Sequence, residues 1–91
     1  MFMSETNITL PNDFNTRFIK NLTYNISELK SSLYITTLDK NVNAKSRLGL
    51  LGLGLKKDSK VRICACNPYN QEQANMDLSV FYNYIVGDAN D

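Results

Sequence analysis

The 91-residue chain contains no histidine, and this absence removes one kind of chemistry. A side chain that accepts and then releases a phosphoryl group near neutral pH is in most cases a neutral imidazole. The chain has only two cysteines, and two thiols without histidine do not make a zinc site. We therefore predict no bound metal and no cofactor.

The two cysteines, Cys64 and Cys66, are two residues apart. In a strand this spacing places both thiols on one face, where a disulfide between them would be strained. A reducing cytosol also disfavours the bond. We interpret them as two small side chains on a sheet face. Thiol chemistry is the alternative, and it would need a lowered thiol pKa.

Strong charge and long apolar runs are also lacking. The net charge is +1 without a basic stripe, which gives no support for a nucleic-acid partner. No apolar run approaches the roughly 20 residues that span a bilayer, so no membrane partner is expected. Residues 1–5 have neither the basic start nor the apolar body of a signal peptide. The pattern predicts a cytoplasmic protein with a single domain over residues 1–91.

The first half of the chain alternates between strand and helix patterns. Residues 6–10 alternate polar and apolar side chains, as a strand does. From Thr16 the period becomes helical, with Asn15 as the expected N-cap and an end near Ser27 or Glu28. The apolar side chains predicted for one helical face are Phe18, Ile19, Leu22, Ile26 and Leu29.

The second half continues this pattern. Strands are predicted at residues 33–36 and 42–44, followed by a short leucine-rich helix over residues 47–53 that ends at Gly52 or Gly54. The clearest strand is 61–66, with Val61, Ile63 and Ala65 facing inward.

A final helix is expected after a capping box of Asn70 and Gln73. Its predicted buried residues are Ala74, Leu78, Phe81, Tyr82 and Ile85. The resulting order, β-α-β-β-α-β-α, predicts an α+β open-faced sandwich, in which an antiparallel sheet has its helices on one face.

Residues 42–55, VNAKSRLGLLGLGL, closely resemble the regulatory-serine segment of HPr, the phosphocarrier protein of the bacterial sugar phosphotransferase system (PTS). The resemblance covers residues 5–86 and is strongest over 40–66. It implies the HPr fold, which has this same order of elements. The run 42–46 also resembles Crh, a histidine-lacking HPr relative of bacilli.

The segment at the start of the first helix departs from this family. HPr proteins carry Gly-Ile-His-Ala-Arg-Pro there, and this chain has Asp-Phe-Asn-Thr-Arg-Phe over residues 13–18. Asn15 stands in the histidine's place, Phe18 in the proline's, and only Arg17 is retained. Crh-type proteins also replace the histidine, by glutamine. Because an amide is a poor nucleophile, we predict no phosphate transfer and no enzymatic activity.

Anion binding could survive this loss. The backbone N–H groups at the helix start near Asn15 and Thr16, together with Arg17, favour a phosphate or sulfate. In the family this arginine helps to bind the phosphoryl group and to contact partners. The alternative is that Asn15 only caps the helix and Arg17 is a solvated charge.

Ser46 is the main functional candidate that the resemblance gives. In Gram-positive relatives a dedicated HPr serine kinase phosphorylates this serine, and the modified protein binds a transcriptional repressor of carbon catabolite control. These two proteins are therefore the implied partners. A phosphate at an N-cap would find backbone donors and a favourable helix dipole. The alternative is that Ser46 is an unmodified N-cap.

The residues after Ser46 also differ from the family, which usually has isoleucine and methionine in a partner-docking surface. Here Arg47 adds a charge that could pair with a phosphate on Ser46, and Leu48 follows. Leu48 and Leu51 either form an exposed docking patch or pack inward, with Leu50 and Leu53 expected in the core. Lys20 and Lys45 are either solvated charges or part of the family's positive, partner-facing rim.

These observations predict a regulatory, Crh-like protein that acts by binding partners. The alternatives are a phosphocarrier in sugar uptake and a decayed paralogue that retains only partner binding. The oligomeric state stays open between monomer and weak dimer, because HPr-type proteins are mostly monomers whereas Crh-type relatives can exchange the first strand.

Overall fold

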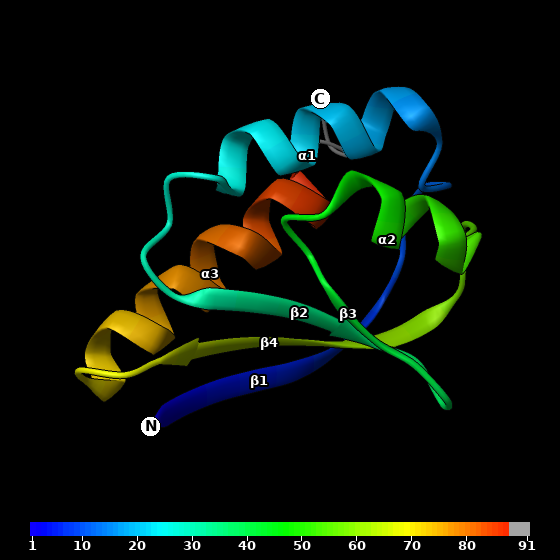
Figure 1. Ribbon diagram of the computed structural model, residues 1–91. Helices are drawn as coiled ribbons and strands as arrows, with labels where there is room; N and C mark the ends of the chain where they lie inside the picture. Colours follow the sequence, from blue (N-terminus) through cyan, green and yellow to red (C-terminus); the bar gives the residue numbers. More distant parts are fainter. Residues whose placement is uncertain (88–91) are drawn as a thin grey trace.

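The computed structural model describes residues 1–87, which form four strands and three helices in the expected order (Figure 1). The elements are β1 (Phe2–Thr9), α1 (Thr16–Ile26), β2 (Ser32–Thr36), β3 (Asn41–Asn43), α2 (Arg47–Leu53), β4 (Lys60–Asn67) and α3 (Gln71–Val86).

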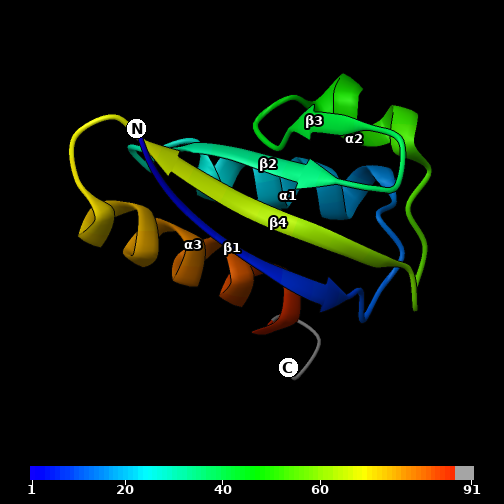
Figure 2. The same ribbon diagram turned by 90° about the horizontal axis from the view of Figure 1, so that it is seen from below.

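The four strands form one antiparallel sheet in the order β1-β4-β2-β3. β4 therefore lies between β1 and β2, with Val61 paired to Ile8 and Ile63 paired to Ile35. α1, α2 and α3 cover one face of the sheet and leave the other face open (Figures 1 and 2). The predicted open-faced α+β sandwich is confirmed.

The hydrophobic core fills the space between the sheet and the helices. β4 contributes Val61, Ile63 and Ala65 to this core, as its alternation predicts. Ile19, Leu22 and Ile26 of α1 and Leu78, Phe81 and Ile85 of α3 are buried against it. None of the helices in residues 1–87 is long and apolar enough to cross a membrane.

Several details differ from the sequence prediction. β1 begins at Phe2 because its backbone pairing with β4 continues to Asn67, beyond the alternating segment at residues 6–10. Tyr82 was predicted to be buried, and this is wrong: it is 39% exposed because the buried face of α3 runs through Phe81 and its helical neighbours. Phe14 lies before the helix and is buried, although no periodic pattern marks it.

The capping box at α3 is only half formed. The Asn70 side chain accepts a hydrogen bond from the Gln73 N–H at 2.6 Å, as predicted. The Gln73 side chain does not return the bond but donates to Asp77 Oδ1. The Asn70 N–H instead donates to Asn67 Oδ1 at 3.1 Å, so the neighbouring loop completes the cap.

Candidate functional site

Asn15 is the N-cap of α1. Its Oδ1 accepts a hydrogen bond from the Phe18 N–H at 2.8 Å, so the helix prediction at this end is confirmed. The Phe18 ring packs on Phe14, with 4.8 Å between the ring centroids, and this contact fixes the chain on both sides of the cap. The amide oxygen is therefore used structurally, in binding a backbone donor.

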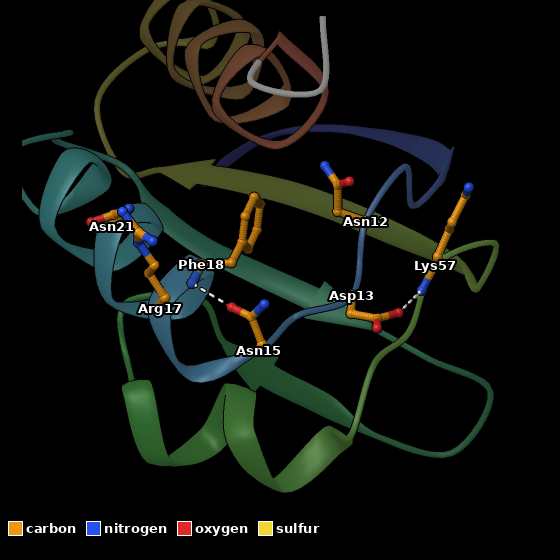
Figure 3. Close-up of a pocket in the computed structure, with 7 residues that line it drawn as sticks. All are labelled: Asn12, Asp13, Asn15, Arg17, Phe18, Asn21 and Lys57. Carbon is orange, nitrogen blue, oxygen red and sulfur yellow. Dashed lines mark hydrogen bonds between the residues drawn. The ribbon is translucent and has the colours of Figure 1, made fainter. Parts of the chain in front are cut away.

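A surface hollow of about 510 Å³ lies beside this helix start (Figure 3). It is lined by Asn12, Asp13, Asn15, Arg17, Phe18, Asn21 and Lys57. Figure 3 shows the Arg17 side chain directed along α1. Arg17 and Lys57 supply positive charge to the hollow, Asp13 supplies negative charge, and Asn12, Asn15 and Asn21 are polar and neutral.

Lys57 is a residue of this hollow that the sequence did not reveal. It lies in the loop between α2 and β4, and its backbone N–H donates to Asp13 Oδ1 at 2.8 Å. In the sequence, residues 56–59 read only as a polar turn. The contact between this turn and the loop before α1 depends on the tertiary fold, so no local pattern could have indicated it.

Ser46 is the N-cap of α2, as predicted. Its Oγ accepts a hydrogen bond from the Gly49 N–H at 3.1 Å, and its side chain is half-buried. A Cβ at Gly49 would lie 2.7 Å from Val42 Cγ1 and 3.2 Å from Ser46 Oγ. The helix ends at Gly54, which has the left-handed conformation common at helix C-termini.

Two positive side chains at and before the start of α2 contact the later part of α1 and the loop that follows it. Lys45 Nζ donates to the Leu29 carbonyl at 2.7 Å, and Arg47 Nε donates to Thr23 Oγ1 at 3.3 Å. The interpretation of Lys45 as a solvated charge is wrong, because it is half-buried and bonded to the backbone. Arg47 is exposed overall but its guanidinium group is turned towards α1.

The leucines of α2 separate into two groups. Leu50 is fully buried and Leu53 packs against the core as a partly buried residue, as expected. Leu48 is 83% exposed and Leu51 is 42% exposed. We call Leu48 and Leu51 the α2 apolar surface. Thr16 and Lys20 of α1 are also exposed.

The predicted site residues form two groups at opposite ends of α1. Asn15, Thr16 and Arg17 lie at its start, whereas Arg47 contacts Thr23 and Lys45 contacts Leu29 near and beyond its end. An 11-residue helix is about 16 Å long. Asn15 and Ser46 cap two different helices, α1 and α2, which lie beside each other on the same face of the sheet (Figure 1).

Residues 3–81 match the protein family described as the PTS HPr component phosphorylation site. The chain belongs to the HPr family. Proteins of this family are phosphocarriers rather than catalysts in the usual sense, and they interact with other proteins of the PTS. The HPr match includes both Asn15 and Ser46, and no histidine is present in the chain.

Solved structures share the HPr fold. HPr from Bacillus anthracis is 20% identical, with 91% of this chain and 96% of that chain covered and a TM-score of 0.79. The histidine-containing phosphocarrier protein from Mycoplasma is 16% identical, with 94% and 96% covered and a TM-score of 0.81. Crh from Bacillus subtilis, solved as a domain-swapped dimer, is 21% identical, with 96% and 95% covered and a TM-score of 0.69. A search of curated proteins finds no match.

The Cys64 thiol of this HPr-family chain is not activated. Cys64 and Cys66 are free and buried, with 3.5 Å between their sulfur atoms. Burial, and then the hydrogen bond with Cys66, raises the pKa of the Cys64 thiol to about 12. A nucleophilic cysteine needs the opposite shift, so Cys64 does not fit the role of a nucleophile.

Proposed function

We propose that this HPr-family protein does not carry phosphate on its first helix and acts as a regulatory protein through the surface around Ser46. The observation that carries the proposal is the side chain at the start of α1. Asn15 stands there, its Oδ1 is bound to the Phe18 N–H, and the chain has no histidine that could replace it.

The chemistry of Asn15 argues against phosphoryl transfer. The nitrogen lone pair of an amide is delocalised into the carbonyl group, whereas a neutral imidazole has a free lone pair that attacks phosphorus. Arg17 and Lys57 remain near the hollow and can still attract an anion. Without a nucleophile, the hollow can bind a phosphate or an acidic group of a partner, but it cannot carry a phosphoryl group covalently.

The surroundings of Ser46 support a regulatory role. Its Oγ faces the Gly49 N–H, and the glycine leaves room at the point where a side chain would crowd that oxygen. A phosphate on Ser46 would add about two negative charges beside the exposed α2 apolar surface. Charge next to exposed leucines is a combination that a protein partner can recognise.

The partners implied by family resemblance are an HPr serine kinase and a catabolite-control repressor. Arg47 and the α2 apolar surface lie directly after Ser46 and would be part of the contact area. Arg47 is bound to Thr23, so pairing with a phosphate on Ser46 requires it to leave that bond. Because this hydrogen bond is long and the Arg47 side chain is exposed, breaking it costs little free energy.

The test is incubation of the chain with an HPr serine kinase and ATP, followed by intact-mass analysis. We expect one added phosphate on the wild-type chain and none on Ser46→Ala. Ser27→Ala is the matched control, because Ser27 is an exposed serine beyond the end of α1, and this variant should accept the phosphate as the wild type does. An unmodified wild-type chain, or a phosphate that persists in Ser46→Ala, would contradict the proposal.

A further inference from the structure

The open face of the sheet carries a pair of sulfur atoms at its centre. Cys64 and Cys66 alternate along β4 with the core residues Ile63 and Ala65, so their side chains point away from the helices. Their Sγ atoms are 3.5 Å apart. No helix within residues 1–87 covers this face (Figure 2), yet the cysteines are only 7% and 8% exposed because neighbouring strand residues flank them.

A third sulfur comes from a different strand. Met3 of β1 lies directly opposite Cys66 in the antiparallel register. Directly paired residues share a face and have Cβ atoms about 4.5–5.5 Å apart. Met3 is 54% exposed and its side chain is flexible, so its thioether can reach the thiol pair from the solvent side.

Two thiols and a thioether are soft ligands, and this set selects monovalent copper over the metals that imidazole and carboxylate bind. Among residues 1–87, no group of three histidine, cysteine, aspartate or glutamate side chains could hold a metal ion. A harder ion such as zinc or magnesium thus lacks the ligands it prefers at this place.

We propose that Cys64, Cys66 and Met3 form a binding site for Cu(I). One Cu(I) ion displaces one proton from each thiol, forms two copper–thiolate bonds and one bond to the thioether, and releases two protons without any change of oxidation state. The ion and two thiolates together carry a net charge of −1. Two charges of opposite sign flank the site on this face: Arg62, two residues before Cys64 on β4, and Glu5, which pairs with Cys64 across β1.

The sequence pointed away from a metal because it offers only two thiols and no histidine. Met3 and Cys66 are far apart in the chain, and only the pairing of β1 with β4 brings the third sulfur to the thiols. This site uses none of the residues near Ser46 or Asn15, so it is independent of the proposed function.

The first experiment is an anaerobic titration of the reduced protein with Cu(I) held by bicinchoninate, a coloured chelator. We expect the protein to remove one equivalent of Cu(I) from the chelator, with a 1:1 complex in native mass spectrometry. Retention of the metal by the chelator would overturn the proposal, as would several weakly bound ions without a 1:1 species.

Variants then test each ligand. Loss of a residue that only supports a metal ligand lowers metal affinity by up to about 100-fold. Because Cys64 and Cys66 are ligands themselves, Cys64→Ser and Cys66→Ser should each lower the Cu(I) affinity by more than that. Met3→Leu should lower it by about tenfold. Met76→Leu is the matched control, because Met76 lies on α3 and is 56% exposed, close to the value for Met3, and its affinity should equal that of the wild type.

X-ray absorption at the copper edge counts the sulfur atoms bound to Cu(I). It tests the proposal without the cysteine variants, if one of them folds poorly. We expect three sulfur neighbours around Cu(I) in the wild type and two in Met3→Leu, a substitution at an exposed position. Equal affinity and an unchanged sulfur count in Met3→Leu would overturn the three-sulfur site.

Discussion

Asn15 forms the cap at the start of α1 with a side chain that is not titratable. The amide oxygen accepts the Phe18 N–H at 2.8 Å, which is the bond an N-cap has to make. No titratable or nucleophilic group remains at that position. The cap was predictable from the sequence because it depends on residues only three positions apart.

Gly49 is the residue whose missing side chain matters most near Ser46. We predict that Gly49→Ala lowers the free energy of unfolding by about 1–3 kcal/mol, because the added Cβ would lie 2.7 Å from Val42 Cγ1. Gly52→Ala in the same helix is the control. Its Cβ meets nothing within 4 Å, and it should raise the free energy of unfolding by about 0.5–1 kcal/mol. Urea denaturation measures both, and equal effects would contradict this assignment.

The thiols of Cys64 and Cys66 should react slowly with alkylating reagents because both are buried. The thiolate is the reactive form, and raising the pKa from 9.0 to about 12 lowers the thiolate fraction of Cys64 near neutral pH by roughly a thousandfold. We predict that iodoacetamide modifies Cys64 of the folded protein far more slowly than it modifies glutathione, and that the rate at Cys64 increases up to strongly alkaline pH. The urea-unfolded chain should react like a free thiol. Equal rates for folded protein and glutathione would contradict the prediction.

At the scale of elements, hydrophobic periodicity was sufficient to predict each strand and helix, because it reports which face of an element is buried. It failed where burial or pairing comes from distant segments. The first residues of β1 are held by their ladder with β4, and Phe14 is buried without belonging to a helical or strand pattern. Tyr82 was predicted to be buried with Leu78 and Ile85, but it lies beside the buried face of α3.

The candidate site divides in the same way. Asn15 and Ser46 could be predicted as caps because capping is local. Sequence could not predict the hydrogen-bond partners of Lys45 and Arg47 or the position of Lys57. Each depends on packing between segments that are distant in the chain.

Lys45 provides a test of the contact between the segment before α2 and the loop after α1. We predict that Lys45→Met lowers the free energy of unfolding by about 1–2 kcal/mol, because its Nζ donates a charged hydrogen bond of 2.7 Å to the Leu29 carbonyl. Lys20→Met removes an exposed charge from α1 and should change the value by less than about 0.5 kcal/mol. Thermal or urea unfolding compares the two, and a Lys45 variant as stable as the Lys20 variant would exclude a structural role for the bond.

At the scale of the whole molecule, α1 and α2 run in opposite directions on the helical side of the sheet. The Asp13–Lys57 contact lies at one end of this pair, and the Lys45–Leu29 contact lies at the other. The two ends of the α1–α2 pair are thus held by separate contacts. The cap formed by Asn15 and the surroundings of Ser46, with the clearance at Gly49 and the exposed leucines, are therefore held by separate contacts.

The measurement that most directly tests the central claim is intact-mass analysis after incubation with enzyme I of the PTS and phosphoenolpyruvate. A histidine-containing HPr in a parallel reaction shows that the donor system is active. We predict that this chain gains no phosphate under these conditions, because Asn15 offers no nucleophile and the chain has no histidine. An acid-labile phosphate on the chain would contradict the claim that its phosphocarrier chemistry is lost.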